Sequence, residues 1–380
     1  NSATTRPYDE VVDYIDDVNR NYYGNPSSLH TKGIQAEKLV RNSRDIIART
    51  LGAARDEIYF TSGGTESNNL AIAGYLYANP RKGKHIITTK TEHPSVLEVF
   101  RHMADQGYNV DYLDVDSKGS VRIDDIERLV NEDTSLISII YINNETGAIQ
   151  PIDEIAAVIK RIGKDIALHV DAVQAYGKLN IIPKNQGIDL LTMSSHKIHG
   201  PKGVGAIYIN KGIKVKPLIL GGGQESLLRS GTENVPGICG FGMAADITFK
   251  SIDSNAEHCS SIKNMFIERL KDEVEDAVVI SPENSSPYIL NVSFAGIRAE
   301  VLLHHLEARN IFVSTGSACS SSKHVHSHVL KAMGIKTELI EGAIRLSFSS
   351  FNTQEDIIET VEAIKDILKG KNSPKYCYAM

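Results

Sequence analysis

The sequence of 380 residues has no tryptophan, few cysteines and no long run of hydrophobic residues. A membrane-spanning helix needs ~18 to 20 consecutive apolar residues, and stretches such as residues 136–142 (LISIIYI) are much shorter. The four cysteines, at positions 239, 259, 319 and 377, are too sparse for a disulfide scaffold and form no CxxC pair. We therefore expect no membrane association and a reducing compartment, the cytoplasm. The chain begins with Asn1 instead of Met, which leaves a removed targeting segment open.

Positive charge is also in short supply. Lys and Arg number 41 against 47 for Asp and Glu, the net charge is -6, and no dense run of basic residues occurs. A nucleic-acid surface usually has such a basic patch, so a small molecule or another protein is the expected partner. Hydrophobic residues make up 41% of the chain, which is ordinary for a folded protein, and the length favours two lobes.

Strand-like apolar segments alternate with helical patterns through the first two thirds of the chain. This alternation predicts an α/β domain with a mainly parallel sheet covered by helices. Parallel strands end at a common edge, where open α/β sheets bind their ligands. From about residue 256 the pattern changes to a long amphipathic helix followed by mixed strands and helices, which predicts a smaller α+β domain.

One lysine and one aspartate follow neighbouring strand-like segments. Lys197 lies in the turn after residues 189–195 (DLLTMSS), and Asp171 ends residues 167–171 (ALHVD), three positions before Gln174. A lysine amine can form a Schiff base with an aldehyde, and a carboxylate can keep a ring nitrogen protonated. These are the two groups that pyridoxal 5'-phosphate (PLP) requires.

A glycine-rich turn follows the strand-like residues 57–62 and opens a helix. Gly64 and Thr65 there offer backbone N–H groups and a hydroxyl to a phosphate. A simple tight turn explains the same glycines equally well. Ser194 and His196, beside the lysine, could donate to the same phosphate, or they could form only local hydrogen bonds of a surface loop.

Three further polar side chains occur at or near predicted strand ends. His93 could stack on a heteroaromatic ring, although a histidine in such a place is more often structural. Asn144, in NNETG, could bind a ring oxygen or a substrate carboxylate, or it could simply belong to a turn. Arg345 interrupts the apolar segment AIRLSFS, so it needs an anionic partner, either a substrate carboxylate or a structural ion pair.

Cys319 lies among small residues in STGSACSSSK, where a thiol is expected to be accessible. Cys239 and Cys259 are expected to be packing residues, and Cys377 an exposed thiol without function. The histidines of residues 323–328 (KHVHSH) match no structural zinc spacing, so no metal site is predicted. They could tune the Cys319 thiol or merely solvate its loop.

The chain resembles the cysteine desulfurases, PLP enzymes related to class V aminotransferases, over nearly its whole length. The resemblance rests on a series of motifs in the family's order and approximate spacing: SGGTESNNLAI, TEHPSV, NNETG, HVDAVQ, SSHKxxGPKGVG, RSGTENVPGI and STGSACSS. GNPSS at residues 24–28 and NSATT at the start extend it. The start usually reads NNATT in the family, so Ser2 here replaces an asparagine.

The resemblance implies the PLP-dependent transferase fold type I, with a seven-stranded sheet in the large domain. Residues 8–255 would form the large PLP-binding domain, and residues 1–7 with 256–380 the small domain that carries the catalytic cysteine loop. The implied activity converts L-cysteine to L-alanine and leaves the sulfur on an active-site cysteine as a persulfide. The sulfur would then be delivered to iron-sulfur cluster assembly, through a protein scaffold, or to another sulfur acceptor.

The resemblance also implies individual roles. Lys197 would be the catalytic Schiff-base lysine, Asp171 the partner of the ring nitrogen, Gln174 the partner of the ring oxygen and His93 the catalytic stacking residue. Cys319 would be the nucleophile that accepts sulfur.

The remaining implied roles concern the phosphate and the substrate. Gly64, Thr65, Ser194 and His196 would hold the phosphate, and Thr232 would reach the phosphate of the other subunit, which implies a homodimer. Asn144 would contact the cofactor and, together with Arg345, the substrate carboxylate. A selenocysteine lyase or a true class V aminotransferase would share most of these residues, and the aminotransferase would need no thiol.

Overall fold

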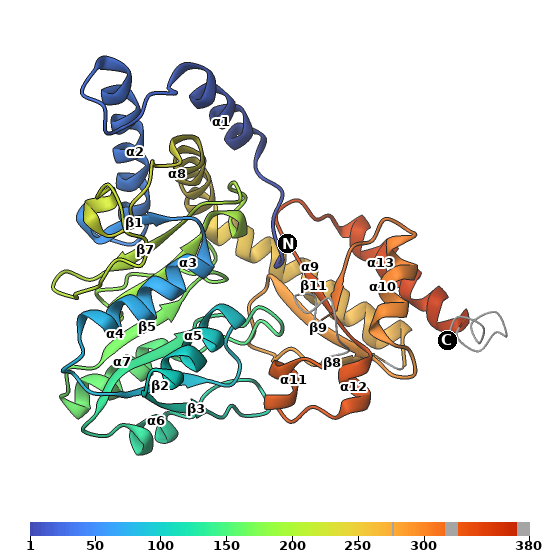
Figure 1. The fold of residues 1–380 in the computed structure, drawn as a ribbon. Helices are drawn as coiled ribbons and strands as arrows, with labels where there is room; N and C mark the ends of the chain where they lie inside the picture. Colours follow the sequence, from blue (N-terminus) through green and yellow to red (C-terminus); the bar gives the residue numbers. More distant parts are fainter. Residues whose placement is uncertain (276, 316–325, 371–380) are drawn as a thin grey trace.

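The computed structural model describes residues 1–275, 277–315 and 326–370, and a seven-stranded sheet forms its larger part (Figure 1). The strand order is β1-β7-β6-β5-β4-β2-β3. Only β7 runs antiparallel to its neighbours in this sheet, so the predicted mainly parallel, seven-stranded sheet is confirmed. The strands are β1 (Ile58–Thr61), β2 (His85–Thr89), β3 (Asn109–Leu113), β4 (Thr134–Ile140), β5 (Ala167–Asp171), β6 (Leu190–Ser194) and β7 (Gly205–Ile209).

Helices bury both faces of this sheet, which is why its inner strands are buried along their whole length. Neighbouring residues of a strand point to opposite faces: Leu136 packs in one hydrophobic cluster and Ile137 in another. One face carries α3 (Gly64–Asn69), a π-helical segment (Leu70–Gly74), α4 (Tyr75–Ala78) and α5 (Pro94–Asp105). The other cluster includes residues of α1 (Asp9–Asn21), α2 (Thr31–Thr50), α6 (Ile123–Leu129), α7 (Ile152–Ile162) and α8 (Val235–Lys250).

A second sheet of four antiparallel strands follows in the order β10-β11-β9-β8. Its strands are β8 (Ala277–Val279), β9 (Ile289–Phe294), β10 (Ser314–Thr315) and β11 (Ala343–Ser347). The accompanying helices are α9 (Ile252–Glu273), α10 (Ala299–Glu307), α11 (His328–Ala332), α12 (Thr337–Glu341) and α13 (Gln354–Gly370). Within the described residues, no helix is long and apolar enough to cross a membrane.

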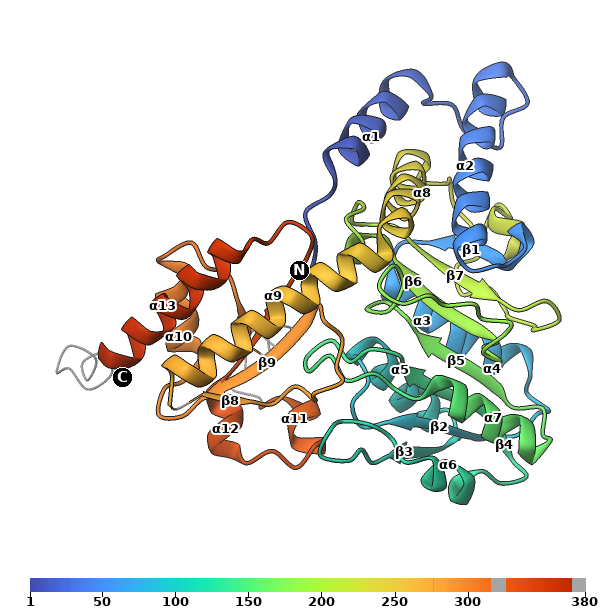
Figure 2. The ribbon, with the colours of Figure 1, turned by 180° about the vertical axis from the view of Figure 1, so that it is seen from behind.

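The long helix α9 runs from the large sheet to the small one, as the view from behind shows (Figure 2). The domain boundary predicted at residue 255 falls in its first turn. The first residues of the chain lie beside the small sheet, where the side-chain amide of Asn1 donates to the carbonyl oxygen of Ser347 in β11. The N-terminal segment therefore contacts the small sheet, while the proposed division into two domains stays a prediction.

Candidate active site

A cavity of about 490 Å³ lies at the carboxyl edge of the large sheet, on the side of the small sheet. Parallel strands β2, β4, β5 and β6 end there, so the loops that follow them converge. The cavity brings together every predicted cofactor-binding and substrate-binding residue except Thr232: Gly64, Thr65, His93, Asn144, Asp171, Gln174, Ser194, His196, Lys197 and Arg345.

Lys197 ends a short 3-10 turn (Ser195–Lys197) directly after β6. Its Nζ donates to the carbonyl oxygens of Ser2, at 2.5 Å, and Ala3, at 2.7 Å. The backbone N–H of Thr5 also donates to the carbonyl oxygen of His196, at 3.0 Å. The N-terminal segment thus forms one wall of the lysine site, a contact that the sequence did not indicate.

The carboxylate of Asp171 is buried at the end of β5 and is held by two donors. Asn68 Nδ2 donates to Oδ2 at 2.8 Å, and the backbone N–H of Val173 donates to Oδ1 at 3.0 Å. Asn68 was not assigned a role from the sequence. The sequence contains one indication of this role: Asn68 follows Gly64 by four residues, so both lie on the same face of the helical segment.

The glycine turn leaves space and donors for an anion. Gly63 has a φ of 151°, and a side chain at Gly64 would begin 2.7 Å from Cγ2 of Val173. On the opposite side, the Ser194 hydroxyl is buried and has no hydrogen-bond partner in the described part of the chain. A buried hydroxyl without a partner costs about 1 to 3 kcal/mol, so a bound phosphate that accepts from it would be stabilising.

His93 caps the N-terminus of α5 and is held by its own helix. Its Nδ1 accepts from the backbone N–H of Ser95 at 3.1 Å and bonds with the Ser95 hydroxyl at 2.8 Å. Burial lowers the pKa of His93 below its usual 6.5, and Lys197 lowers it further, while Asp171 opposes the shift. The neutral imidazole is suited to packing against an aromatic ring.

The Nδ1 atom of His196 forms a hydrogen bond of 3.1 Å with the hydroxyl of Thr4. Burial lowers the pKa of His196 to about 4, and nearby Lys197, Lys202 and Lys178 contribute in the same direction. At neutral pH this imidazole is therefore uncharged, so it can support a phosphate by a hydrogen bond but not by an ion pair.

Arg345 in β11 brings a positive charge into the cavity from the small sheet. One of its Nη atoms donates to the carbonyl oxygen of Asn144 at 2.7 Å. Burial raises the pKa of Glu145, next to it, while the Ser327 hydroxyl, His328 and Arg345 lower it. The Ser327 hydroxyl donates to Glu145 at 2.5 Å. Arg345 therefore lies along the NNETG turn and lines the cavity.

Cys319 lies outside the described residues, as do Cys377 and the first three residues of KHVHSH. The last three, residues 326–328, line the cavity, and His328 Nε2 donates to the carbonyl oxygen of Glu92 at 2.9 Å. Cys239 and Cys259 are fully buried, and burial raises their pKa values to about 11 and about 12. These two thiols are packing residues, as predicted.

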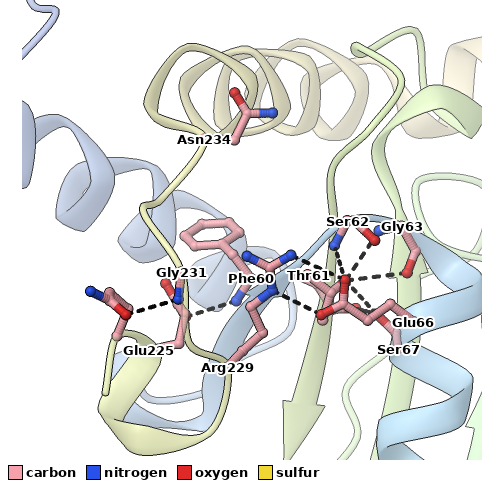
Figure 3. A network of polar contacts seen from close by, with 12 residues as sticks. Phe60, Thr61, Ser62, Gly63, Glu66, Ser67, Glu225, Arg229, Gly231 and Asn234 are labelled. Carbon is pink, nitrogen blue, oxygen red and sulfur yellow. Dashed lines mark hydrogen bonds and ion pairs between the residues drawn. The ribbon is translucent and has the colours of Figure 1, made fainter. Parts of the chain in front are cut away.

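Thr232 is exposed and does not line the cavity of its own chain. The loop before it is nevertheless tied to the glycine turn (Figure 3). Arg229 Nε donates to Glu66 Oε1 at 2.9 Å, and Glu66 Oε2 accepts from the backbone N–H of Ser62 at 2.8 Å. The buried carboxylate of Glu225 anchors the same loop to the backbone N–H of β1. Side-chain hydrogen bonds thus link the loop before Thr232 to the predicted phosphate turn.

Comparison with known proteins agrees with this geometry. The family described as aminotransferase class-V matches residues 1–359. The chain belongs to this family. Members of the class-V family depend on PLP, and the cavity fits that cofactor. It offers a lysine amine, a buried carboxylate and, beside the glycine turn, a serine hydroxyl that has no partner among the described residues.

Two curated class-V relatives have the same activity in their names. The chain is 42% identical to "Cysteine desulfurase IscS" of Dictyoglomus turgidum over 369 residues, 97% of this chain and 93% of the relative. It is also 42% identical to a "Cysteine desulfurase" of Nostoc sp. over 370 residues, 97% of this chain and 92% of the relative.

Two solved structures have the same fold. A "NIFS-LIKE PROTEIN" superposes with a TM-score of 0.92 at 40% identity and covers 97% of this chain and 98% of its own. A NifS-like protein from Rickettsia africae superposes with a TM-score of 0.87 at 32% identity, with the same coverage of both chains.

Proposed function

We propose that this protein is a PLP-dependent cysteine desulfurase, a sulfurtransferase that converts L-cysteine to L-alanine and passes the sulfur to Cys319. One observation carries the proposal. A chain 42% identical to named cysteine desulfurases over 97% of its length gathers Lys197, Asp171 and Arg345 around one cavity.

The residues of the large sheet would hold the cofactor. Lys197 would bind it covalently, Asp171 would pair with its ring nitrogen, His93 would pack on its ring and Gln174 would bond to its ring oxygen. Bound PLP withdraws electrons from the substrate Cα, which makes the Cα proton acidic and prepares the Cβ side chain for loss of sulfur. Asn68 supports this role because it fixes Asp171 at 2.8 Å.

The phosphate would lie between two strand ends. The residues that line this part of the cavity are Gly64, Thr65, Ser194 and His196. Among the described residues, the buried Ser194 hydroxyl has no hydrogen-bond partner. Thr232 would complete this site in a partner subunit. Backbone N–H groups and hydroxyls suit a phosphate because they donate without requiring a bulky side chain.

Substrate chemistry would then depend on four side chains of this protein. Arg345 and Asn144 would bind the carboxylate of L-cysteine, and the amine of Lys197 would carry the proton from Cα. The thiolate of Cys319 would attack the substrate sulfur, so that an S–S bond forms as the C–S bond breaks. The products balance: the enzyme gains one sulfur atom as a persulfide, and the substrate leaves as L-alanine.

A homodimer is part of the proposal. Apolar side chains near the Thr232 loop are exposed, among them Leu220 at 79% and Leu227 at 73%. Such residues on a chain of net charge -6 are suited to a subunit interface. Residues 8–255 would form the large domain, and residues 1–7 with 256–380 the small one.

The destination of the sulfur is also a proposal. The persulfide would be delivered to a protein acceptor such as an iron-sulfur scaffold, as the name IscS suggests for the relatives. A cytoplasmic location is supported by the two buried, unpaired thiols of Cys239 and Cys259, which are typical of a reducing compartment.

Steady-state assays of purified protein test the activity. With L-cysteine and a thiol reductant, the parent should release alanine and sulfide in equal amounts. Lys197→Ala and Cys319→Ser should each abolish sulfide release, whereas Cys377→Ser should retain it. Parent-rate alanine formation by Cys319→Ser would contradict the persulfide route and favour aminotransferase-like chemistry. Preference for L-selenocysteine with little turnover of L-cysteine would instead indicate a selenocysteine lyase.

A further inference from the structure

A line of hydrogen bonds connects a second lysine to Lys197. Lys178 Nζ donates to Gln174 Oε1 at 2.8 Å, and Gln174 Nε2 donates to the carbonyl oxygen of Ser2, also at 2.8 Å. That carbonyl oxygen accepts from Lys197 Nζ at 2.5 Å. Lys178 lies four positions after Gln174 in the turn after β5, and the assigned roles leave Lys178 without a function.

The two neighbours of Gln174 permit one orientation of its amide. An amine of lysine presents N–H donors, so it faces the amide oxygen, and a backbone carbonyl can only accept, so it faces the amide nitrogen. We propose that Lys178 is a positioning residue that holds the Gln174 amide with its Nε2 donor directed toward Lys197 and the cofactor ring. This inference rests on the proposed function, in which Gln174 bonds to the ring oxygen.

The surroundings of Lys178 keep its amine in place. Its Nζ lies 5.5 Å from the centre of the Tyr288 ring and lines a small cavity of about 20 Å³ next to Lys197. Burial lowers the pKa of Lys178 to about 7, and the charges of Lys197 and Arg345 contribute, while Cys259 opposes. The amine keeps N–H donors in both protonation states, so it can hold the Gln174 oxygen in either.

Lys178→Met is the direct test because methionine has a similar length and no donor. Without the amine only the carbonyl oxygen of Ser2 holds the amide, so the position of its Nε2 donor is less firmly fixed. We expect the PLP dissociation constant to rise about five- to tenfold, the effect of one hydrogen bond. The absorption maximum of the Lys197-bound cofactor should shift, and kcat should fall more than KM rises. Lys178→Arg, which keeps the donor, should restore most of both properties.

Lys263→Met is the matched control for loss of a buried lysine. Lys263 Nζ donates to the Ser285 hydroxyl at 2.7 Å and to the carbonyl oxygen of Ser286 at 2.9 Å, and burial lowers its pKa to about 8. It does not line the PLP cavity. This variant should lose stability but keep the parent absorption and PLP affinity.

A double-mutant cycle separates positioning from a structural role. In a Gln174→Ala background, Lys178→Met should have no further effect on absorption, because the amide it positions is gone. Gln174→Glu keeps the partner of Lys178 but lacks the N–H donor, so it should reproduce the absorption shift even if Lys178→Met does not fold.

Three outcomes would overturn the inference: an unchanged spectrum in Lys178→Met, an equal effect of Lys178→Met with and without Gln174, or a parent-like spectrum in Gln174→Glu. If the parent protein binds PLP through Lys197, either of the first two outcomes refutes only the role of Lys178. The third also contradicts the proposed bond from Gln174 to the ring oxygen. A parent that shows no Lys197-dependent absorption refutes the proposed function as well.

Discussion

Glu92 should make the protein less stable as pH rises, because its carboxyl group is buried beside the active site. The side chain is 0% exposed. Its Oε1 accepts from the Thr89 hydroxyl at 2.8 Å and from the backbone N–H of Ile140 at 2.9 Å, and its Oε2 has no partner in the described residues. Burial raises the pKa of Glu92 to about 8, and Asp171 contributes, while the two hydrogen bonds oppose.

The magnitude follows from the two pKa values. The unfolded chain should titrate near 4.5 and the folded chain near 8, and each unit is equivalent to about 1.4 kcal/mol. Between pH 4.5 and pH 8 the folded state keeps the proton that the unfolded chain has lost. The contribution of the Glu92 carboxyl to the free energy of unfolding is therefore complete below pH 4.5 and is lost as pH rises to 8. The total loss is up to about 5 kcal/mol. Glu92→Gln imitates the protonated form and should escape this loss.

Urea unfolding at fixed subunit concentration, from pH 5 to 9, measures the effect in the PLP-loaded protein. The stability of Glu92→Gln relative to the parent should increase steadily up to pH 8 and then level off. Glu10→Gln, at an exposed carboxyl of α1, controls for the general effect of removing a negative charge. Parallel curves for the parent and Glu92→Gln would refute the assignment of a buried, protonated carboxyl to Glu92.

Three further outcomes are expected. Lys197→Ala should lose the visible absorption of the lysine-bound cofactor while its far-ultraviolet circular dichroism stays that of the parent; retained absorption would contradict the role of Lys197. Arg345→Ala should raise KM for L-cysteine far more than it weakens PLP binding, and an unchanged KM would return Arg345 to a structural role. Asn68→Ala should weaken PLP binding through Asp171 by up to about 1.5 to 3 kcal/mol, the value of a hydrogen bond to a charged group, as measured by cofactor titration; parent affinity would contradict it.

The large sheet and the positions around it were predictable because its inner strands are short, mainly apolar segments that alternate with helical patterns. β4 and β5, for example, are buried at every residue. The edge strand β3 was not recognised, because most of its residues are only partly buried and polar residues interrupt it. The expected continuous helix after Gly64 contains a π-helical segment (Leu70–Gly74), and the sequence has no local feature that indicates this.

The cavity was predictable where side chains follow parallel strands, because such strands end at one edge. His93, Asp171 and Lys197 meet there for this reason. Contacts made by backbone atoms could not be predicted. The carbonyl oxygen of Ser2 accepts from Lys197, which is 195 positions away, and any residue type has the same carbonyl group. The orientation of the Gln174 side-chain amide depends on the same carbonyl oxygen, so it could not be predicted from the sequence either.

The central claim is that sulfur from L-cysteine passes to Cys319. Purified, PLP-loaded protein should be given L-cysteine without a reductant and analysed by peptide mass spectrometry, with alanine quantified in the same sample. We expect one additional sulfur atom on the peptide that contains Cys319, about one alanine for each persulfide formed, and neither product in Lys197→Ala. Alanine without a persulfide on Cys319, or a persulfide located on Cys377 instead, would contradict it.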